Sequence, residues 1–164
     1  MAQIRTQESD FTVDDLFEAL EPLAPGVARR RVFEALSGVD YLDLDAIWLG
    51  HKDIPQNASA SALLRNLALL LGLRKKDAAT VLNVSESRIS RNDRLDIPML
   101  DRAQGVAEVF AEVAAVLGPQ GAQHWLETPN PALQGTPPYQ LLGTTYGERR
   151  VRNLVTALLN GAVV

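Results

Sequence analysis

Closely spaced arginine and serine side chains in residues 85–94, SESRISRNDR, are well suited to contact an anionic polymer. Arg88 and Arg91 lie three residues apart, which places both on one face of a helix. Guanidinium groups donate hydrogen bonds to phosphates and to the guanine edge, and hydroxyls donate to phosphates. We therefore predict a DNA-binding face made of Lys75, Lys76, Ser85, Ser87, Arg88, Ser90, Arg91 and Arg94.

Two short helices must position this face. An apolar stripe of Ala78, Ala79 and Leu82 marks the first helix, and its small alanines allow a close helix crossing. Ile89 is expected to point inward from a second helix over residues 86–93, together with Leu82 and Val84. This arrangement is a helix-turn-helix, whose second helix enters the major groove. An ordinary helical hairpin with a solvated arginine face is the alternative.

The turn and the cap support the same interpretation. Asn83, with Val84, occupies the turn, where asparagine is the residue after glycine that best accepts a positive φ. Ser85 is a suitable N-cap for the second helix. One position departs from the pattern, because Asn92 stands where such motifs usually carry an apolar residue.

Composition indicates an all-α fold. The chain has 164 residues, of which 46% are hydrophobic, 22% charged and only 5% aromatic, and leucine and alanine dominate the core positions. It contains no cysteine, which excludes disulfides and thiolate metal sites and fits a reducing cytoplasm. The first ten residues lack an apolar run, so we expect no signal peptide. No apolar stretch approaches the roughly 20 residues of a membrane span.

Charge is distributed unevenly along the chain. The net charge is −6 for residues 1–60, +3 for residues 61–105 and −1 for residues 106–164. The positive charge therefore gathers around the helix-turn-helix, as a local phosphate-contacting patch requires. Because one copy is only modestly charged, we expect a dimer on DNA.

The remaining pattern predicts three regions: 1–60, 61–97 and 98–164. In the first we expect a helix from Phe11, with Thr12 as its N-cap, and a second over residues 27–36; residues 41–49 are helical or irregular. The run Arg29–Arg31 fits a solvated face better than a second nucleic-acid patch. The linker-like residues 50–61 give a soft boundary, and we expect residues 1–60 to dock against the next domain or against a second copy of the chain.

Helices also dominate the other two regions. An apolar helix over residues 62–71 should lie under the helix-turn-helix. A long helix should open at Asp96–Pro98 and end at Gly118, burying Ala103, Val106, Phe110, Val113 and Leu117. A short helix with Trp125 follows, then a turn-rich segment with one short helix near residues 139–142. The last helix, residues 148–160, should bury Val151, Leu154, Val155, Leu158 and Leu159.

Residues 125–161, WLETPNPALQGTPPYQLLGTTYGERRVRNLVTALLNG, resemble the toxin-binding domain of the Xre/MbcA/ParS antitoxin family. The likeness lies in spaced positions that include Trp125–Leu126, Pro129–Asn130, Leu133, Gly135, Leu141–Leu142, Gly147, Val151, Leu158 and Gly161. An upstream helix-turn-helix of the Xre type follows the family's order, so the likeness spans about residues 62–164. Residues 1–60 fall outside it.

This resemblance implies a dimeric antitoxin that binds a RES-domain toxin, a class that consumes NAD or transfers part of it. In the family the antitoxin's C-terminal end enters the toxin's active-site cleft, and members often repress their own operon. The implied toxin-binding residues are Trp125, Pro129, Asn130, Leu133, Arg149, Arg150, Arg152, Leu158, Gly161, Ala162, Val163 and Val164. For Trp125 we prefer a core role, pinning the turn-rich segment, over a role at an interface.

Two other functions compete with the antitoxin. An enzyme is disfavoured because His51 and His124 have no metal-spaced partners and no phosphate loop or nucleophile motif is present; we expect no cofactor. A stand-alone transcriptional regulator would use the same helix-turn-helix, with the C-terminal helices as a small-molecule sensor. A RES-type toxin gene beside this one would favour the antitoxin.

Overall fold

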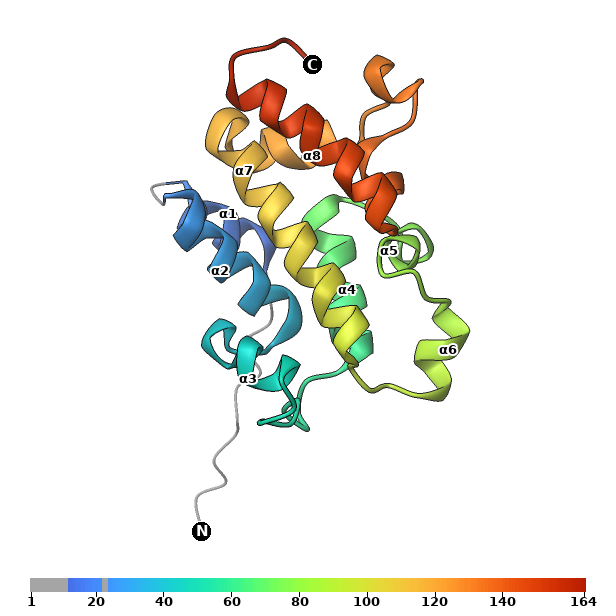
Figure 1. The fold of residues 1–164 in the computed structure, drawn as a ribbon. Helices are drawn as coiled ribbons and strands as arrows, with labels where there is room; N and C mark the ends of the chain where they lie inside the picture. The colour runs from blue at the N-terminus through green and yellow to red at the C-terminus, as the bar shows by residue number, and fades with distance from the viewer. Residues whose placement is uncertain (1–11, 22–23) are drawn as a thin grey trace.

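The computed structural model describes residues 12–21 and 24–164, and it confirms the all-α fold (Figure 1). In these ranges β structure is confined to two isolated bridges. The first ten residues and the predicted helix start at Phe11 lie outside the described residues. The helices are α1 (Val13–Leu20), α2 (Pro25–Ser37), η1 (Tyr41–Asp43), α3 (Leu44–Trp48), α4 (Ala60–Leu71), α5 (Lys75–Val81), α6 (Glu86–Arg91), α7 (Ile97–Glu127), η2 (Pro131–Leu133), η3 (Pro138–Leu141) and α8 (Thr145–Leu159).

Helix α7 is the central helix of the fold. The sequence pattern predicts the buried apolar side of this helix. Helix α2 packs along it, and α4 and α8 pack against it from other directions (Figure 1). Phe110 and Leu100 of α7 are fully buried, as are Phe33 of α2 and Leu67 of α4. Close packing of such side chains supplies most of the stability of short helices.

Local signals set the helix ends, at the predicted residues for Thr12, Gly38 and Gly72, whereas the cap at Ser59 was not predicted. Thr12 caps α1 by accepting a hydrogen bond from the Asp15 amide, and Ser59 caps α4 in the same way. Gly38 and Gly72 end α2 and α4 with φ of 69° and 66°, a conformation that glycine adopts without steric cost.

The predicted break at Gly118 is a bend inside α7. Gly118 has φ 75° and ψ 165°, and Pro119 follows it, so the helix restarts in a new direction. The second part carries Trp125 and Leu126, both buried. Two short 3₁₀ helices, η2 and η3, form in the turn-rich segment, where the sequence predicted one.

Residues 24–60 share the core of the remaining helices. The buried Asn66 side chain on α4 donates hydrogen bonds to the Ala35 and Leu36 carbonyls at the end of α2. The run Arg29–Arg31 keeps the solvent exposure expected of it, and two of its arginines also form ion pairs: Arg29, 39% exposed, with Glu108 of α7, and Arg30, 43% exposed, with Glu34. Two of the three arginines in this run therefore pair with carboxylates on a neighbouring helix or a neighbouring turn.

Two predicted core residues are exposed. Leu117 lies just before the bend in α7 and is 41% exposed, because the buried part of the apolar stripe ends one turn earlier, at Val113. Leu159, the last residue of α8, is 47% exposed. Among the described residues, no helix combines the length and the apolar character needed to cross a bilayer.

Candidate functional site

The first candidate surface is the helix-turn-helix surface, formed by α5, α6 and the turn between them. Ala78 and Ala79 are buried where α5 crosses its neighbours, as predicted. Asn83 takes φ 55°, the positive value expected for the turn. The Ser85 hydroxyl accepts a hydrogen bond from the Arg88 amide and caps α6, and Ile89 is buried beneath it.

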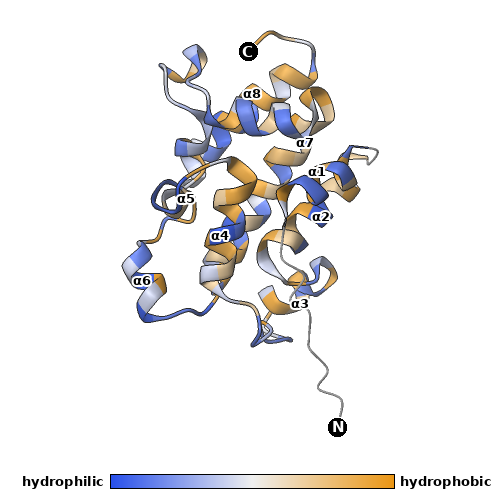
Figure 2. Cartoon of the chain, turned by 180° about the vertical axis from the view of Figure 1, so that it is seen from behind, coloured by the Kyte–Doolittle hydropathy of each residue, from blue (hydrophilic) through white to orange (hydrophobic). Residues whose placement is uncertain are grey.

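The outer face of α6 is hydrophilic, as Figure 2 shows. Ser87, Arg88, Ser90 and Arg91 are all exposed on it, so the structure brings these four predicted residues together. Ser85 lies at its start, and Lys75 and Lys76 are exposed at the start of α5. The DNA contacts themselves remain a prediction.

The expected position of Arg94 on the same helix is wrong. Helix α6 ends at Arg91, because Asn92 adopts extended backbone angles of −146° and 96°. Arg94 instead lies in an isolated bridge with Ser59. The carboxylate of Asp93 accepts hydrogen bonds from the amide and hydroxyl of Ser61, which fixes this loop against the start of α4. The polar residue noted at position 92 therefore marks an early helix end.

Both arginines of α6 have intramolecular partners. Arg88 Nη2 lies 2.7 Å from Asp96 Oδ2, and Arg91 Nε donates to the Ser87 carbonyl. Neither contact buries the guanidinium, since the Arg88 side chain remains 45% exposed. Sequence patterning did not predict the Arg88–Asp96 pair, because its partners are on different helices.

The second candidate surface is the α8 surface, formed by α8, the turn-rich segment and residues 161–164. Asn130 is buried; its side chain accepts from the Ala132 amide, and its backbone pairs with Thr136. Leu133 and Leu158 are also buried, while Pro129 is exposed. In this chain, Asn130 and Leu133 thus stabilise the turn-rich segment.

Trp125, in the second part of α7, contacts the residues that follow α8. Its ring is 9% exposed, and its indole Nε1 donates a hydrogen bond to the Val164 carbonyl at 3.3 Å. Gly161, with φ 83°, turns the chain after α8 so that this contact can form. Ala162 and Val163 are exposed, Val163 completely, and Val164 is half-buried. The core position preferred for Trp125 is therefore correct.

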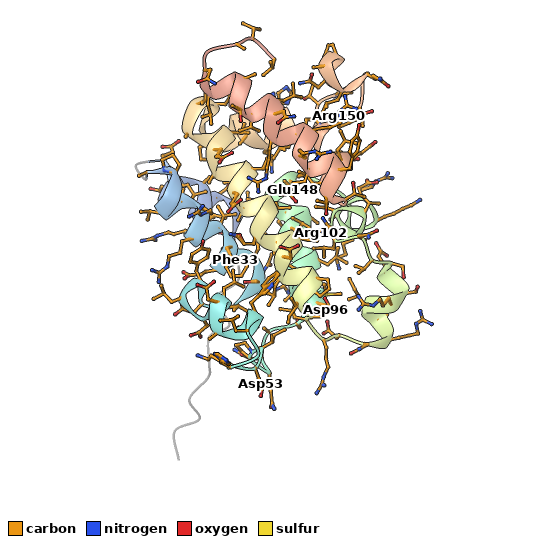
Figure 3. All side chains as sticks on the ribbon, in the orientation of Figure 1. Phe33, Asp53, Asp96, Arg102, Glu148 and Arg150 are labelled. Carbon is orange, nitrogen blue, oxygen red and sulfur yellow. The ribbon has the colours of Figure 1, made fainter. Side chains whose placement is uncertain are left out.

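The three arginines of α8 have different surroundings. Arg149 is exposed and lies over the Tyr146 ring at 5.7 Å, while Arg150 points to the Ala132 carbonyl on the turn-rich segment (Figure 3). Arg152 pairs with Glu108 of α7 and with Glu148 at 2.8 Å. Partial burial opposes its charge, yet the hydrogen bonds to Glu148 and Glu108 prevail and raise the pKa of Arg152 above its ordinary value.

A contact that sequence reasoning missed connects the two surfaces. A Cβ at Gly143, just before α8, would stand 2.4 Å from the Thr80 carbonyl of α5. A Cβ at Gly147 would lie 2.0 Å from the Leu141 carbonyl. Only glycine permits such an approach of two backbones. A glycine in a turn-rich segment was the available signal, but its partner on α5 could not be read from local sequence.

The described residues contain no group of three or more metal-ligating side chains of the His, Cys, Asp or Glu type. The two candidate surfaces provide hydrogen bonds, charges and apolar contacts. These features suit binding to macromolecules.

A comparison with known proteins finds a family match that includes most of the second surface. Residues 107–161 match the family model of the antitoxin Xre/MbcA/ParS C-terminal toxin-binding domain, which confirms the family resemblance inferred from the residues. The match begins within α7 and ends at Gly161, so it includes the bend, the turn-rich segment and α8 but neither α5 nor α6. A search of curated proteins found no match. The family match supports an antitoxin role in a toxin–antitoxin system, with a toxin as partner.

Proposed function

We propose that this chain is an antitoxin that neutralises a RES-type, NAD-consuming or ADP-ribosylating toxin and represses its own operon as a dimer. The observation that carries the proposal is the match of residues 107–161 to an antitoxin toxin-binding domain. Within that domain, the turn-rich segment and α8 carry exposed side chains that a partner could contact. The chain itself has no catalytic role in this proposal.

Neutralisation is proposed to occur by insertion of residues 161–164 into the toxin's active-site cleft. Val163 is fully exposed, and Leu159 projects from the last turn of α8. Exposed apolar side chains of this kind gain free energy when a concave pocket removes them from water. The Trp125 hydrogen bond to Val164 keeps the segment close to one conformation, which reduces the entropy lost on binding.

Polar contacts to the toxin are assigned to the exposed side of α8. Arg149 presents its guanidinium to solvent, and Arg150 is half-buried. Arg152 already serves two carboxylates, so a toxin contact would have to share its donors with Glu108 and Glu148. We therefore expect Arg149 to contribute more than Arg152 to direct recognition.

DNA binding is assigned to the helix-turn-helix surface, with α6 in the major groove. The exposed Ser87, Arg88, Ser90 and Arg91 support this assignment, because they form one preformed face over the buried Ile89. A dimer would double the number of phosphate contacts and read two half-sites. The rival function, a stand-alone regulator, uses the same face and takes the C-terminal helices as a sensor.

One experiment separates the two functions. The chain is co-expressed with the product of the adjacent gene, the complex is purified, and NAD consumption is measured with and without the chain. A stable complex with abolished NAD loss supports the antitoxin. A complex that leaves NAD loss unchanged, or no complex at all, contradicts neutralisation and leaves the regulator as the better function.

A further inference from the structure

The carboxylate of Asp96 contacts two helices at once. Its Oδ1 accepts a hydrogen bond from the Met99 amide at 2.9 Å and so caps α7. Its Oδ2 accepts from Arg88 Nη2 on α6 at 2.7 Å. Figure 3 shows Asp96 at the start of α7, on the side that faces α6. One side chain thus ties the exposed α6 to the central helix.

The cap fixes where this carboxylate lies. Helix α7 is anchored by Met99 and Leu100, which are buried in its first turn. Asp96 therefore cannot move without losing the cap, and its second oxygen has a defined position relative to α6. Helix α6 itself has only six residues, so its side chains receive little restraint from their own helix.

Arg88 keeps accessible donors while it is held. A guanidinium has five N–H donors in a rigid planar arrangement, and Asp96 accepts from one of its terminal nitrogens. The Arg88 side chain is 45% exposed and borders a shallow hollow of about 240 Å³ that is also lined by Asn83, Asp96 and Arg102. The remaining donors can therefore reach a ligand from a restricted set of directions.

We propose that Asp96 is a positioning residue for DNA recognition, which orients Arg88 so that α6 discriminates between base sequences. The proposal rests on the proposed DNA binding of the helix-turn-helix surface. A free arginine would lose rotamer freedom on binding a base edge, whereas Arg88 is already ordered before DNA arrives. Asp96 makes no contact with DNA in this proposal and acts through Arg88.

Removal of the carboxylate has two opposing effects that can be measured separately. Loss of a negative charge near the DNA strengthens sequence-independent binding, because fewer phosphates are repelled. Loss of orientation weakens sequence-specific binding. The diagnostic quantity is therefore the ratio of specific to non-specific affinity, which a change in charge alone does not lower.

Asp96→Ser and Asp96→Asn test this proposal in the full-length chain. Both residues are good N-caps and retain an acceptor for the Met99 amide, while neither offers Arg88 a carboxylate. Asp101→Asn is the matched control, since Asp101 is exposed on α7 about one turn further on and has no ion pair among the described residues. Thermal unfolding of each variant establishes that the fold is kept.

The wild-type chain first selects duplexes from a random-sequence DNA pool, and the selected duplex and a scrambled one become the probes. We expect the ratio of the two affinities to fall about tenfold in both Asp96 variants and to stay unchanged in the Asp101 control. An unchanged ratio in folded Asp96 variants overturns the proposal, as does an equal rise of both affinities. If the wild-type chain selects no duplex, DNA binding itself fails, and the two failures are thus distinguishable.

Discussion

Arg152 of α8 donates a hydrogen bond to Glu108 of α7, and the same carboxyl group accepts from Arg29 of α2. Glu148, one turn before Arg152, takes a further donor of that guanidinium. This charge cluster joins three helices across the side of α7, and its members are only partly exposed. It links the N-terminal helices to the domain matched by the antitoxin family model.

Arg152→Met should lower the free energy of unfolding by about 1–2 kcal/mol, because Glu108 and Glu148 lose their shared cation. Urea unfolding measures the change. Arg149→Met is the control: Arg149 is exposed, so its loss should cost less than about 0.5 kcal/mol. Equal effects of the two substitutions would contradict the importance of the cluster.

The pH dependence of that difference also has a definite sign. Because the pKa of Arg152 is raised in the folded chain, its contribution is fully present below the ordinary arginine pKa and is lost only as pH rises through the higher pKa of the folded state. The stability difference between wild type and Arg152→Met should therefore stay constant from about pH 7 to 10. A decline across that range would show that Arg152 is not held as a paired cation.

Gly143→Ala should destabilise the chain by about 1–3 kcal/mol, since its Cβ would lie 2.4 Å from the Thr80 carbonyl and must displace backbone. Gly26→Ala is a matched control of opposite sign. Gly26 lies in the first turn of α2, has open space around it and has no positive φ, so alanine should stabilise the chain by up to about 1 kcal/mol. Melting temperatures measure both, and a neutral Gly143→Ala would refute the close contact.

Val163→Asp should weaken toxin neutralisation with little change in folding or DNA affinity. Val163 is fully exposed, so the substitution costs the isolated chain almost nothing, whereas a carboxylate in an apolar cleft is strongly disfavoured. Removal of Ala162–Val164 should act in the same direction. Leu49→Asp, an exposed leucine outside the matched domain, is the control and should leave neutralisation intact. Full toxin inhibition by Val163→Asp would make insertion of this segment untenable.

Replacing Arg88 and Arg91 with alanine should have the reverse pattern. Each lost base contact should cost about 1–3 kcal/mol of DNA-binding free energy, while toxin inhibition is unaffected. Electrophoretic mobility shifts at fixed salt measure the loss. Arg31→Ala removes an exposed arginine from α2 and serves as the charge control. If Arg31→Ala weakens DNA binding as much as Arg88→Ala, general charge would explain the affinity.

Features encoded within one or two turns of helix could be predicted from the sequence. The caps Thr12 and Ser85, the positive φ of Asn83 and the bend at Gly118 all depend on neighbouring residues, and each was found as expected. The buried apolar stripe of α7 was also predicted, except at Leu117. The apolar pattern in the sequence continues to Leu117, but this residue is exposed.

Contacts between distant segments could not be predicted in this way. The partners Arg88 and Asp96, Glu108 and Arg152, and Gly143 and Thr80 meet only because of how α5, α6, α7 and α8 are placed in space. The predicted position of Arg94 was wrong for a related reason. Arg94 pairs with Ser59 and does not continue α6. The spacing of the family-like positions found the toxin-binding domain but gave no role to individual arginines.

The close approach of Gly143 to Thr80 limits how the two candidate surfaces can move. Two backbones in direct contact leave no flexible side chain between them to absorb a change of angle. A toxin seated on the α8 surface would therefore be carried at a fixed orientation relative to α6. In a dimer on DNA, the positions of two bound toxins would then be set by the geometry of each subunit. Whether both half-sites can be occupied at once becomes a question of steric fit, with no flexible hinge to relieve a clash.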